Sequence, residues 1–185
     1  MKHVAICLFA LFFWNELRAS EPLNVEFYEV RGNNARDLRK ELGDHGPVGD
    51  DGSRHHGYTK WHVDWTFQLI PSGKLCAIGS VETKLEVTMT LPKWNKPEGL
   101  LEDLTREWER YSTALRLHED GHYNIAVSAA QEIERRLSGL TGTAGCKTLA
   151  EDINSKARAV IEEFRAKDLG YDVATEHGAT QGARF

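Results

Sequence analysis

Five consecutive residues near the middle of the chain have the types and spacing of a zinc hydrolase motif. They read His118-Glu119-Asp120-Gly121-His122, which is the HExxH pattern. In a helix, His118 and His122 lie about one turn apart on one face, so both imidazoles can bind a single Zn²⁺ ion. Glu119 is predicted to be the catalytic base that takes a proton from the attacking water.

The motif lies in a segment whose apolar residues recur at helical spacing, from residue 100 to residue 137. The recurring residues include Leu101, Leu104, Trp108, Tyr111, Leu115, Ile125, Ala129 and Ile133. His118 and His122 fall on the same stripe, so we expect them to face the interior, where imidazole nitrogens need a partner. A metal ion is one such partner, and ordinary hydrogen bonds of two core histidines are the alternative.

Two features of this helical segment give further expectations. A helix of that length would span about 57 Å at 1.5 Å per residue, which is long for a small domain, so we expect a bend or a break in it. Gly121 inside the motif costs about 1 kcal/mol relative to Ala in a helix. This favours a place where another part of the backbone packs closely.

The first nineteen residues are typical of a secretory signal. Met1-Lys2-His3 is a short basic start, residues 4–14 are apolar, and Leu17-Arg18-Ala19 precedes an expected cleavage at Ser20. The apolar run is too short to span a bilayer, although a retained anchor is the alternative. We therefore expect a periplasmic or secreted protein with no membrane span after cleavage, one domain over residues 20–178, and a flexible tail over 179–185.

Charge and cysteine content narrow the possible partners and the compartment. The formal net charge is −5, and no basic patch for nucleic acid or anionic lipid stands out. Cys76 and Cys146 are an even pair outside the signal, and oxidising compartments favour a disulfide between them over two free thiols. The bond would join the β region to the loop after the motif helix. The oligomeric state is left open.

Alternating apolar and polar residues predict a β region before the motif helix. We expect a first strand at Val25–Val30, then a short helix capped by Asn33 or Asn34. A long hairpin follows, with strands at residues 61–69 and 81–91 and a turn at 71–74. The glycine-rich loop over residues 43–57 contains His45, His55 and His56, which we interpret as solvated side chains rather than as a second metal site.

A second helix is predicted after the motif helix. Apolar residues recur from Leu149 to Phe164, Thr148 with Glu151 fits a capping box, and the helix is expected to end near Gly170. The predicted fold class is therefore α+β, with a small antiparallel sheet and a long hairpin, followed by the HExxH helix and a second C-terminal helix.

A hydrolytic zinc site usually has three protein ligands and an open position, and HExxH supplies two of them. The third ligand should lie on a later segment that folds back over the motif helix. Spacing does not choose among the later candidates, which are Glu151, Glu162, Glu163, Asp172, Glu176 and His177.

The sequence resembles the predicted secreted zinc-dependent bacterial proteases known as domain of unknown function 922, which are grouped with the zincin-like peptidases. The similar features extend from about Val25 to Gly178 and comprise Trp61, Trp65, Cys76, Leu91-Pro92-x-Trp94, His118-Glu119-x-x-His122, Cys146 and Tyr171-Asp172-x-x-Thr175-x-His177-Gly178.

The resemblance implies a zincin-like fold and makes His177 the expected third zinc ligand. Asp172 or Glu176 would then not bind the metal itself but would orient one of the ligating histidines. Tyr171 would either donate a hydrogen bond to a developing oxyanion or pack below the motif helix.

Two functions from different classes follow. The first is zinc-dependent hydrolysis of a peptide or protein substrate, which an exposed edge of the hairpin could hold as an added strand. The second is a non-catalytic envelope protein with a structural metal site or a partner-binding helix, since a fold can outlast its activity.

Overall fold

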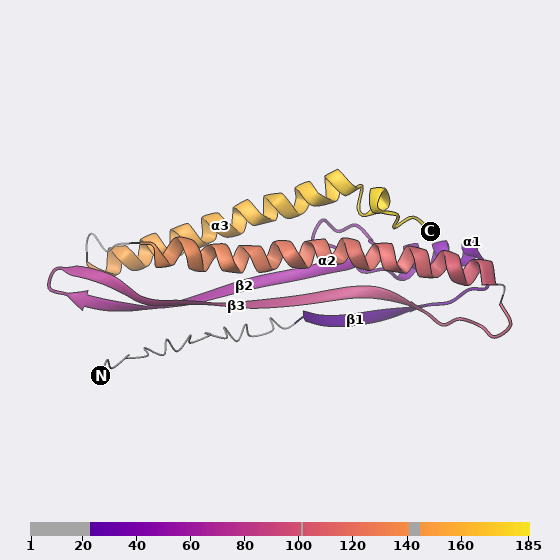
Figure 1. The fold of residues 1–185 in the computed structure, drawn as a ribbon, viewed down its shortest axis with the longest axis horizontal. Helices are drawn as coiled ribbons and strands as arrows, with labels where there is room; N and C mark the ends of the chain where they lie inside the picture. Colours follow the sequence, from indigo (N-terminus) through magenta and orange to yellow (C-terminus); the bar gives the residue numbers. More distant parts are fainter. Residues whose placement is uncertain (1–22, 101, 141–144) are drawn as a thin grey trace, which may run out of the picture.

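The computed structural model describes residues 23–100, 102–140 and 145–185, so the predicted signal at 1–19 lies outside the described residues. None of the helices in these ranges combines the length and the hydropathy that a bilayer span requires. The predicted α+β class is confirmed. The elements are β1 (Leu23–Val30), α1 (Ala35–His45), β2 (Tyr58–Ser72), β3 (Leu75–Trp94), α2 (Glu102–Ser138), α3 (Cys146–Thr175) and the 3₁₀-helix η1 (Ala179–Gln181) (Figure 1).

The three strands form one mixed sheet in the order β1-β3-β2. β2 and β3 make the predicted long antiparallel hairpin, which turns at residues 73–74. β1 runs parallel to β3, from the pair Leu23↔Val87 to the pair Val30↔Trp94, so the prediction of a purely antiparallel sheet is wrong for this strand. The end of β1 and the start of β2 lie at the same end of β3, and α1 with residues 46–57 joins the two edges there.

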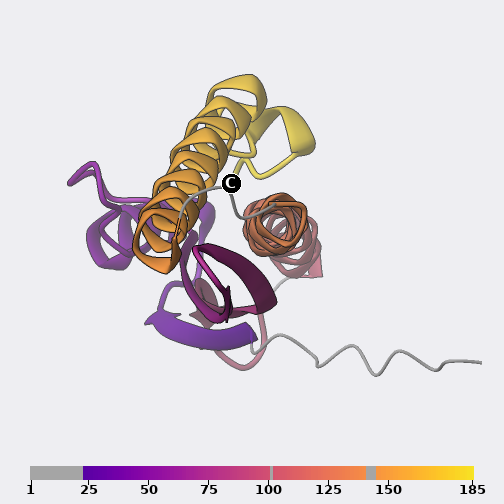
Figure 2. The same ribbon diagram turned by 90° about the vertical axis from the view of Figure 1, so that its left-hand side faces the viewer.

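α2 and α3 lie side by side over one face of the sheet (Figures 1 and 2). Inward residues of the hairpin, such as Val63, Leu85 and Val87, join one buried cluster with the helices. Small side chains on α2 contribute to this cluster, namely Ala126, Ala129 and Ala130. Alternate residues of β2 and β3 remain exposed, as expected for a sheet with one covered face.

The predicted break in the motif helix is wrong, because α2 is one continuous helix of 37 residues, and Figure 1 shows no sharp kink in it. At 1.5 Å per residue it is about 55 Å long. β3 has 20 residues, which at 3.3 Å each extend over about 66 Å. The long strand and α3 therefore offer α2 apolar partners along most of its length, and the molecule is elongated accordingly (Figure 1).

The disulfide between Cys76 and Cys146 is confirmed, with 5.0 Å between the two Cα atoms. It joins β3 to the first residue of α3 rather than to a preceding loop. Because α3 begins at Cys146, Thr148 and Glu151 lie inside the helix and the predicted capping box is wrong. The helix also continues past Gly170 to Thr175.

Two further predictions concern the cap of α1 and the C-terminal segment. Asn34 caps α1, because its side chain accepts a hydrogen bond from the backbone N–H of Asp37 at 3.0 Å. Residues 179–185, which we expected to form a flexible tail, instead return along α2, and Phe185 packs against Trp108 and Tyr111.

Candidate metal centre

Three side chains from α2 and α3 bring their ligand atoms to one point. His118 and His122 are both buried on α2, and their Nε2 atoms are 3.2 Å apart. Oδ1 of Asp172, on α3, lies 3.2 Å from each of these nitrogens. Among the described residues, this is the group of His, Cys, Asp and Glu side chains whose ligand atoms are close enough to share a metal ion.

The antiparallel packing of α2 on α3 explains why these residues meet. His122 faces Asp168, and His118, four residues earlier on α2, faces Asp172, four residues later on α3. Because residues four apart share a helix face, both pairs form from one register of the two helices. Buried apolar residues continue the same face of α3 toward its start, namely Leu149, Ile153, Ala157, Val160 and Phe164. The core therefore sets the register that assembles the site.

Hydrogen bonds behind the cluster fix the orientation of both imidazoles. Nδ1 of His122 lies 2.8 Å from Oδ1 of Asp168, and Nδ1 of His118 lies 3.0 Å from Oε1 of Gln181. Both partners are acceptors, so we assign the ring protons to Nδ1. When both rings are neutral, each Nε2 then presents a lone pair toward the carboxylate oxygen of Asp172. In that form three acceptors face one another, and either a proton on His122 or a metal ion would satisfy them.

The spacing and chemistry of these atoms fit Zn²⁺. Bonds of about 2.0–2.1 Å at tetrahedral angles place neighbouring ligand atoms about 3.3 Å apart, close to the observed 3.2 Å. Two imidazoles and one carboxylate are also a donor set that hydrolytic zinc sites use, with a fourth position left for water or substrate.

In the metal-free cluster, the carboxylates and imidazoles shift one another's pKa values. Burial lowers the pKa of His122, but hydrogen bonds to Asp168 and Asp172 outweigh it and raise this pKa to about 10. Burial raises the pKa of Asp172, but hydrogen bonds from His118 and His122 hold it well below its ordinary value. The metal-free cluster therefore keeps a proton on His122, which a bound metal would have to displace.

Glu119 lies beside the two histidines and is almost completely buried. Its Oε2 accepts a hydrogen bond from the Thr59 hydroxyl at 2.7 Å. Its Oε1 lies against Gly57, where an added Cβ would come within 2.7 Å of that oxygen. Burial raises the pKa of Glu119, and the Thr59 hydrogen bond only partly opposes this. The carboxylate is therefore a stronger proton acceptor than an exposed glutamate.

Gly121 leaves the space that the ring of Tyr171 occupies. A Cβ added at Gly121 would lie 2.2 Å from the Tyr171 hydroxyl oxygen. The close neighbour is thus a side chain and not the backbone that we expected. The Tyr171 ring stacks on His118 with centroids 5.1 Å apart, and its hydroxyl donates to the His118 carbonyl at 3.3 Å. Of the two interpretations of Tyr171, the geometry favours packing.

His177, the predicted third ligand, lies next to this cluster but not within it. It follows α3 in a left-handed backbone conformation, and its side chain is 61% exposed. Its Nδ1 is 3.3 Å from Oδ1 of Asp172, and its ring lies 5.5 Å from that of His55. The ligand role of His177 stays a prediction. Asp172 is the residue that joins His118 and His122 in the metal-ligand cluster.

The loop histidines are less solvated than expected. His56 is half-buried, and its Nδ1 lies 2.8 Å from the Tyr111 hydroxyl. The Tyr28 hydroxyl donates to the His56 carbonyl at 2.7 Å. These contacts hold the backbone that leads to Gly57 against Glu119. His45 is exposed, as interpreted from the sequence.

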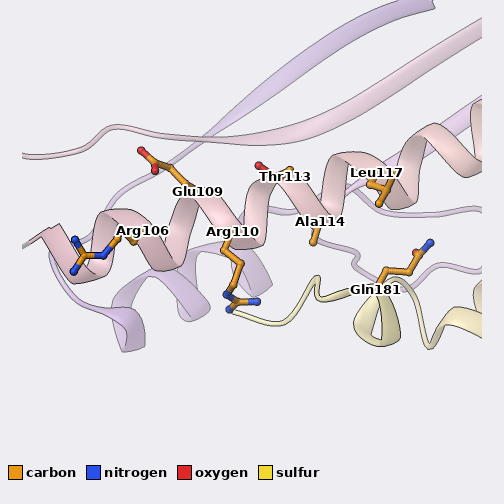
Figure 3. A pocket seen from close by; sticks show the side chains of 7 residues that line it. All are labelled: Arg106, Glu109, Arg110, Thr113, Ala114, Leu117 and Gln181. Carbon is orange, nitrogen blue, oxygen red and sulfur yellow. The ribbon is translucent and has the colours of Figure 1, made fainter.

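Two surface cavities of about 490 Å³ each lie outside the metal-ligand cluster. The first runs along α2 and reaches Gln181; it is lined by Arg106, Glu109, Arg110, Thr113, Ala114, Leu117 and Gln181 (Figure 3). The second is bordered by the end of β3 and by Trp108. Neither contains His118, His122 or Asp172, although Gln181 connects the first cavity to His118.

Residues 25–178 match the model of a family described as "Bacterial protein of unknown function (DUF922)". The chain belongs to this family. The match begins in β1, includes every residue of the metal-ligand cluster and ends before Gln181. No curated protein and no solved structure matches the chain.

Proposed function

We propose that this protein is an exported zinc-dependent hydrolase that cleaves peptide bonds. The observation that carries the proposal is the convergence of two imidazole nitrogens and the Asp172 carboxylate beside the buried Glu119. Zinc held by His118, His122 and Asp172 would lower the pKa of water toward ~7 and polarise the substrate carbonyl.

The protein's own contribution to the reaction centres on Glu119. Thr59 occupies Oε2, which leaves Oε1 to take a proton from the attacking water. The raised pKa of this carboxyl makes the transfer easier near neutral pH, and the same oxygen then passes the proton to the leaving amine. Thr59 thereby acts as a positioning residue for the base.

An extended peptide is the substrate shape that this arrangement favours. β2 is an edge strand of the described sheet, and Thr59 lies near its start. A peptide that pairs with this edge would pass close to Glu119. The backbone of such a substrate would supply most of the contacts, so we expect broad rather than narrow sequence preference.

The test combines metal analysis with hydrolysis of a peptide library. Glu119→Gln should keep stoichiometric zinc and lose hydrolysis by about 10²–10⁴-fold, because only the base is removed. Asp172→Ala should lose zinc. Asp64→Asn, which changes an exposed carboxylate elsewhere on β2, is the matched control and should change neither quantity. Zinc-loaded wild-type protein that cleaves no peptide, or an active Glu119→Gln variant, would contradict the proposal.

The position of His177 favours a second candidate, a non-catalytic envelope protein with a structural metal. Its Nδ1, 3.3 Å from the Asp172 carboxylate, could supply a fourth ligand and close the site. His177→Ala separates the two functions. A closed structural site should lose zinc affinity in this variant, whereas a hydrolytic site with Asp172 as third ligand should retain zinc.

A further inference from the structure

We propose that residues 178–185 form a strap that holds His118 in its metal-binding orientation, with Gln181 as the positioning residue. The inference rests on the proposed metal site and adds a regulatory element to it. All of this segment except Gly178 lies beyond the end of the family match, and it connects the metal centre to an anchor on α1 and the first half of α2.

The strap contacts His118 at two points. Gly178 has φ +81°, and an added Cβ there would lie 2.9 Å from Cγ of His118, so the backbone itself packs on the imidazole. Three residues later, Oε1 of Gln181 accepts the Nδ1 proton of His118 at 3.0 Å. The Gln181 amide nitrogen donates to the Tyr171 hydroxyl at 3.0 Å, which turns its oxygen toward the imidazole.

The anchor of the strap lies at its far end. The Arg110 guanidinium on α2 donates to the carbonyls of Gly182 and Arg184, both at 3.0 Å. The ring of Phe185 packs at 5.1 Å from Tyr111, and Arg39 of α1 donates to the Phe185 carbonyl at 2.7 Å. Figure 3 shows Arg110 reaching from α2 toward the C-terminal segment, with Gln181 on η1 beyond it.

This arrangement couples the anchor to the metal site. The hydrogen bond to Nδ1 sets which nitrogen of His118 keeps its lone pair, and losing such a bond typically weakens metal affinity by 10–100-fold. Gln181 stays in place because the segment on both sides of it is pinned, to His118 at Gly178 and to the helices at Phe185. Release of Phe185, by cleavage of the strap or by a competing partner, would therefore lower zinc affinity without touching a ligand.

The experiment measures zinc affinity of the disulfide-bonded protein by competition with a chromophoric chelator. Gln181→Ala should weaken zinc binding by about 10–100-fold. Gln181→Glu keeps an acceptor for Nδ1 and should restore wild-type affinity, which a merely structural role would not predict. Phe185→Ala should fall between wild type and Gln181→Ala. Lys84→Ala removes only an exposed ion pair with Glu86 on β3, outside the strap, and is the matched control, expected within twofold of wild type.

A second readout does not depend on metal. In zinc-free protein, Phe185→Ala should speed hydrogen exchange at the amides of Gly182 and Ala183, which bond to Ala179 and Gly178. Zinc affinity unchanged by Gln181→Ala, or exchange unchanged by Phe185→Ala, would overturn the strap and leave the proposed hydrolase standing. Wild-type protein that binds no zinc would overturn both.

Discussion

Gly121→Ala is the most direct test of how α2 and α3 build the site. The added methyl would lie 2.2 Å from Oη, 2.4 Å from Cζ and 2.7 Å from Cε1 of Tyr171. Non-bonded carbon contacts are normally about 3.5–4.0 Å. The Tyr171 ring would therefore have to move by more than about 1 Å, away from its stacked position on His118.

The expected magnitude follows from three terms. Replacing glycine by alanine in a helix stabilises by about 1 kcal/mol. Overpacking against Tyr171 costs about 1–3 kcal/mol. Displacing the hydroxyl breaks its hydrogen bonds with the His118 carbonyl and the Gln181 amide, at about 0.5–1.5 kcal/mol each. We expect a net loss of about 1–5 kcal/mol in the free energy of unfolding, together with weaker zinc binding.

The assay is denaturant unfolding of zinc-free, disulfide-bonded protein, followed by zinc titration. Gly170→Ala on α3 is the matched control, because an added Cβ there meets no atom within 4 Å. That substitution should stabilise the protein by about 0.5–1 kcal/mol. Tyr171→Ala in the Gly121→Ala background should show a favourable coupling energy, since the clash is then gone. A Gly121→Ala protein as stable as its Gly170→Ala counterpart would refute the packing of Tyr171 on α2.

Three further predictions concern other parts of the molecule. Gly57→Ala should abolish most hydrolysis but keep zinc, because its Cβ would come within 2.7 Å of Oε1 of Glu119; an active variant in the peptide assay would contradict this. Removing the Cys76–Cys146 disulfide by a double alanine substitution should lower the free energy of unfolding by about 2–5 kcal/mol, measured by denaturant, while an unshifted midpoint would argue against the bond. Burial lowers the pKa of His56 below its ordinary 6.5, so the unfolded state binds more protons below that pH and stability falls as the pH falls. His56→Asn should flatten that part of the stability–pH curve, and an identical slope would show that this histidine does not contribute.

Local periodicity made much of the fold predictable. The alternation in the hairpin and the three-and-four spacing around His118 are properties of single segments, so both elements were recognisable in the sequence. The parallel pairing of β1 was not, because strand direction depends on where the connection through α1 crosses the sheet. The unbroken α2 likewise depends on the length of β3, which no local pattern in the helix records.

The candidate site also contains both residues that a local sequence pattern predicts and residues that only long-range packing brings together. The HExxH pair is local, whereas the choice of Asp172 depends on the register of two helices and therefore on the whole core. One signal was available: Asp168 and Asp172 repeat the four-residue spacing of His118 and His122. Thr59 and Gln181 carried no comparable signal, because their roles arise from long-range contacts of ordinary polar residues.

The Asp168 carboxylate would also make a cation bound at the candidate site optically visible. One of its oxygens accepts from the Trp61 indole at 3.1 Å on β2, and the other faces His122. Any redistribution of charge on that imidazole is transmitted to the indole through a single side chain. The intrinsic emission of Trp61 should therefore follow zinc loading without an added dye, and Trp61→Phe should silence the response. Trp61 on β2, Asp168 on α3 and His122 on α2 are linked by hydrogen bonds, so a tryptophan of the sheet would report on the candidate metal site between the helices.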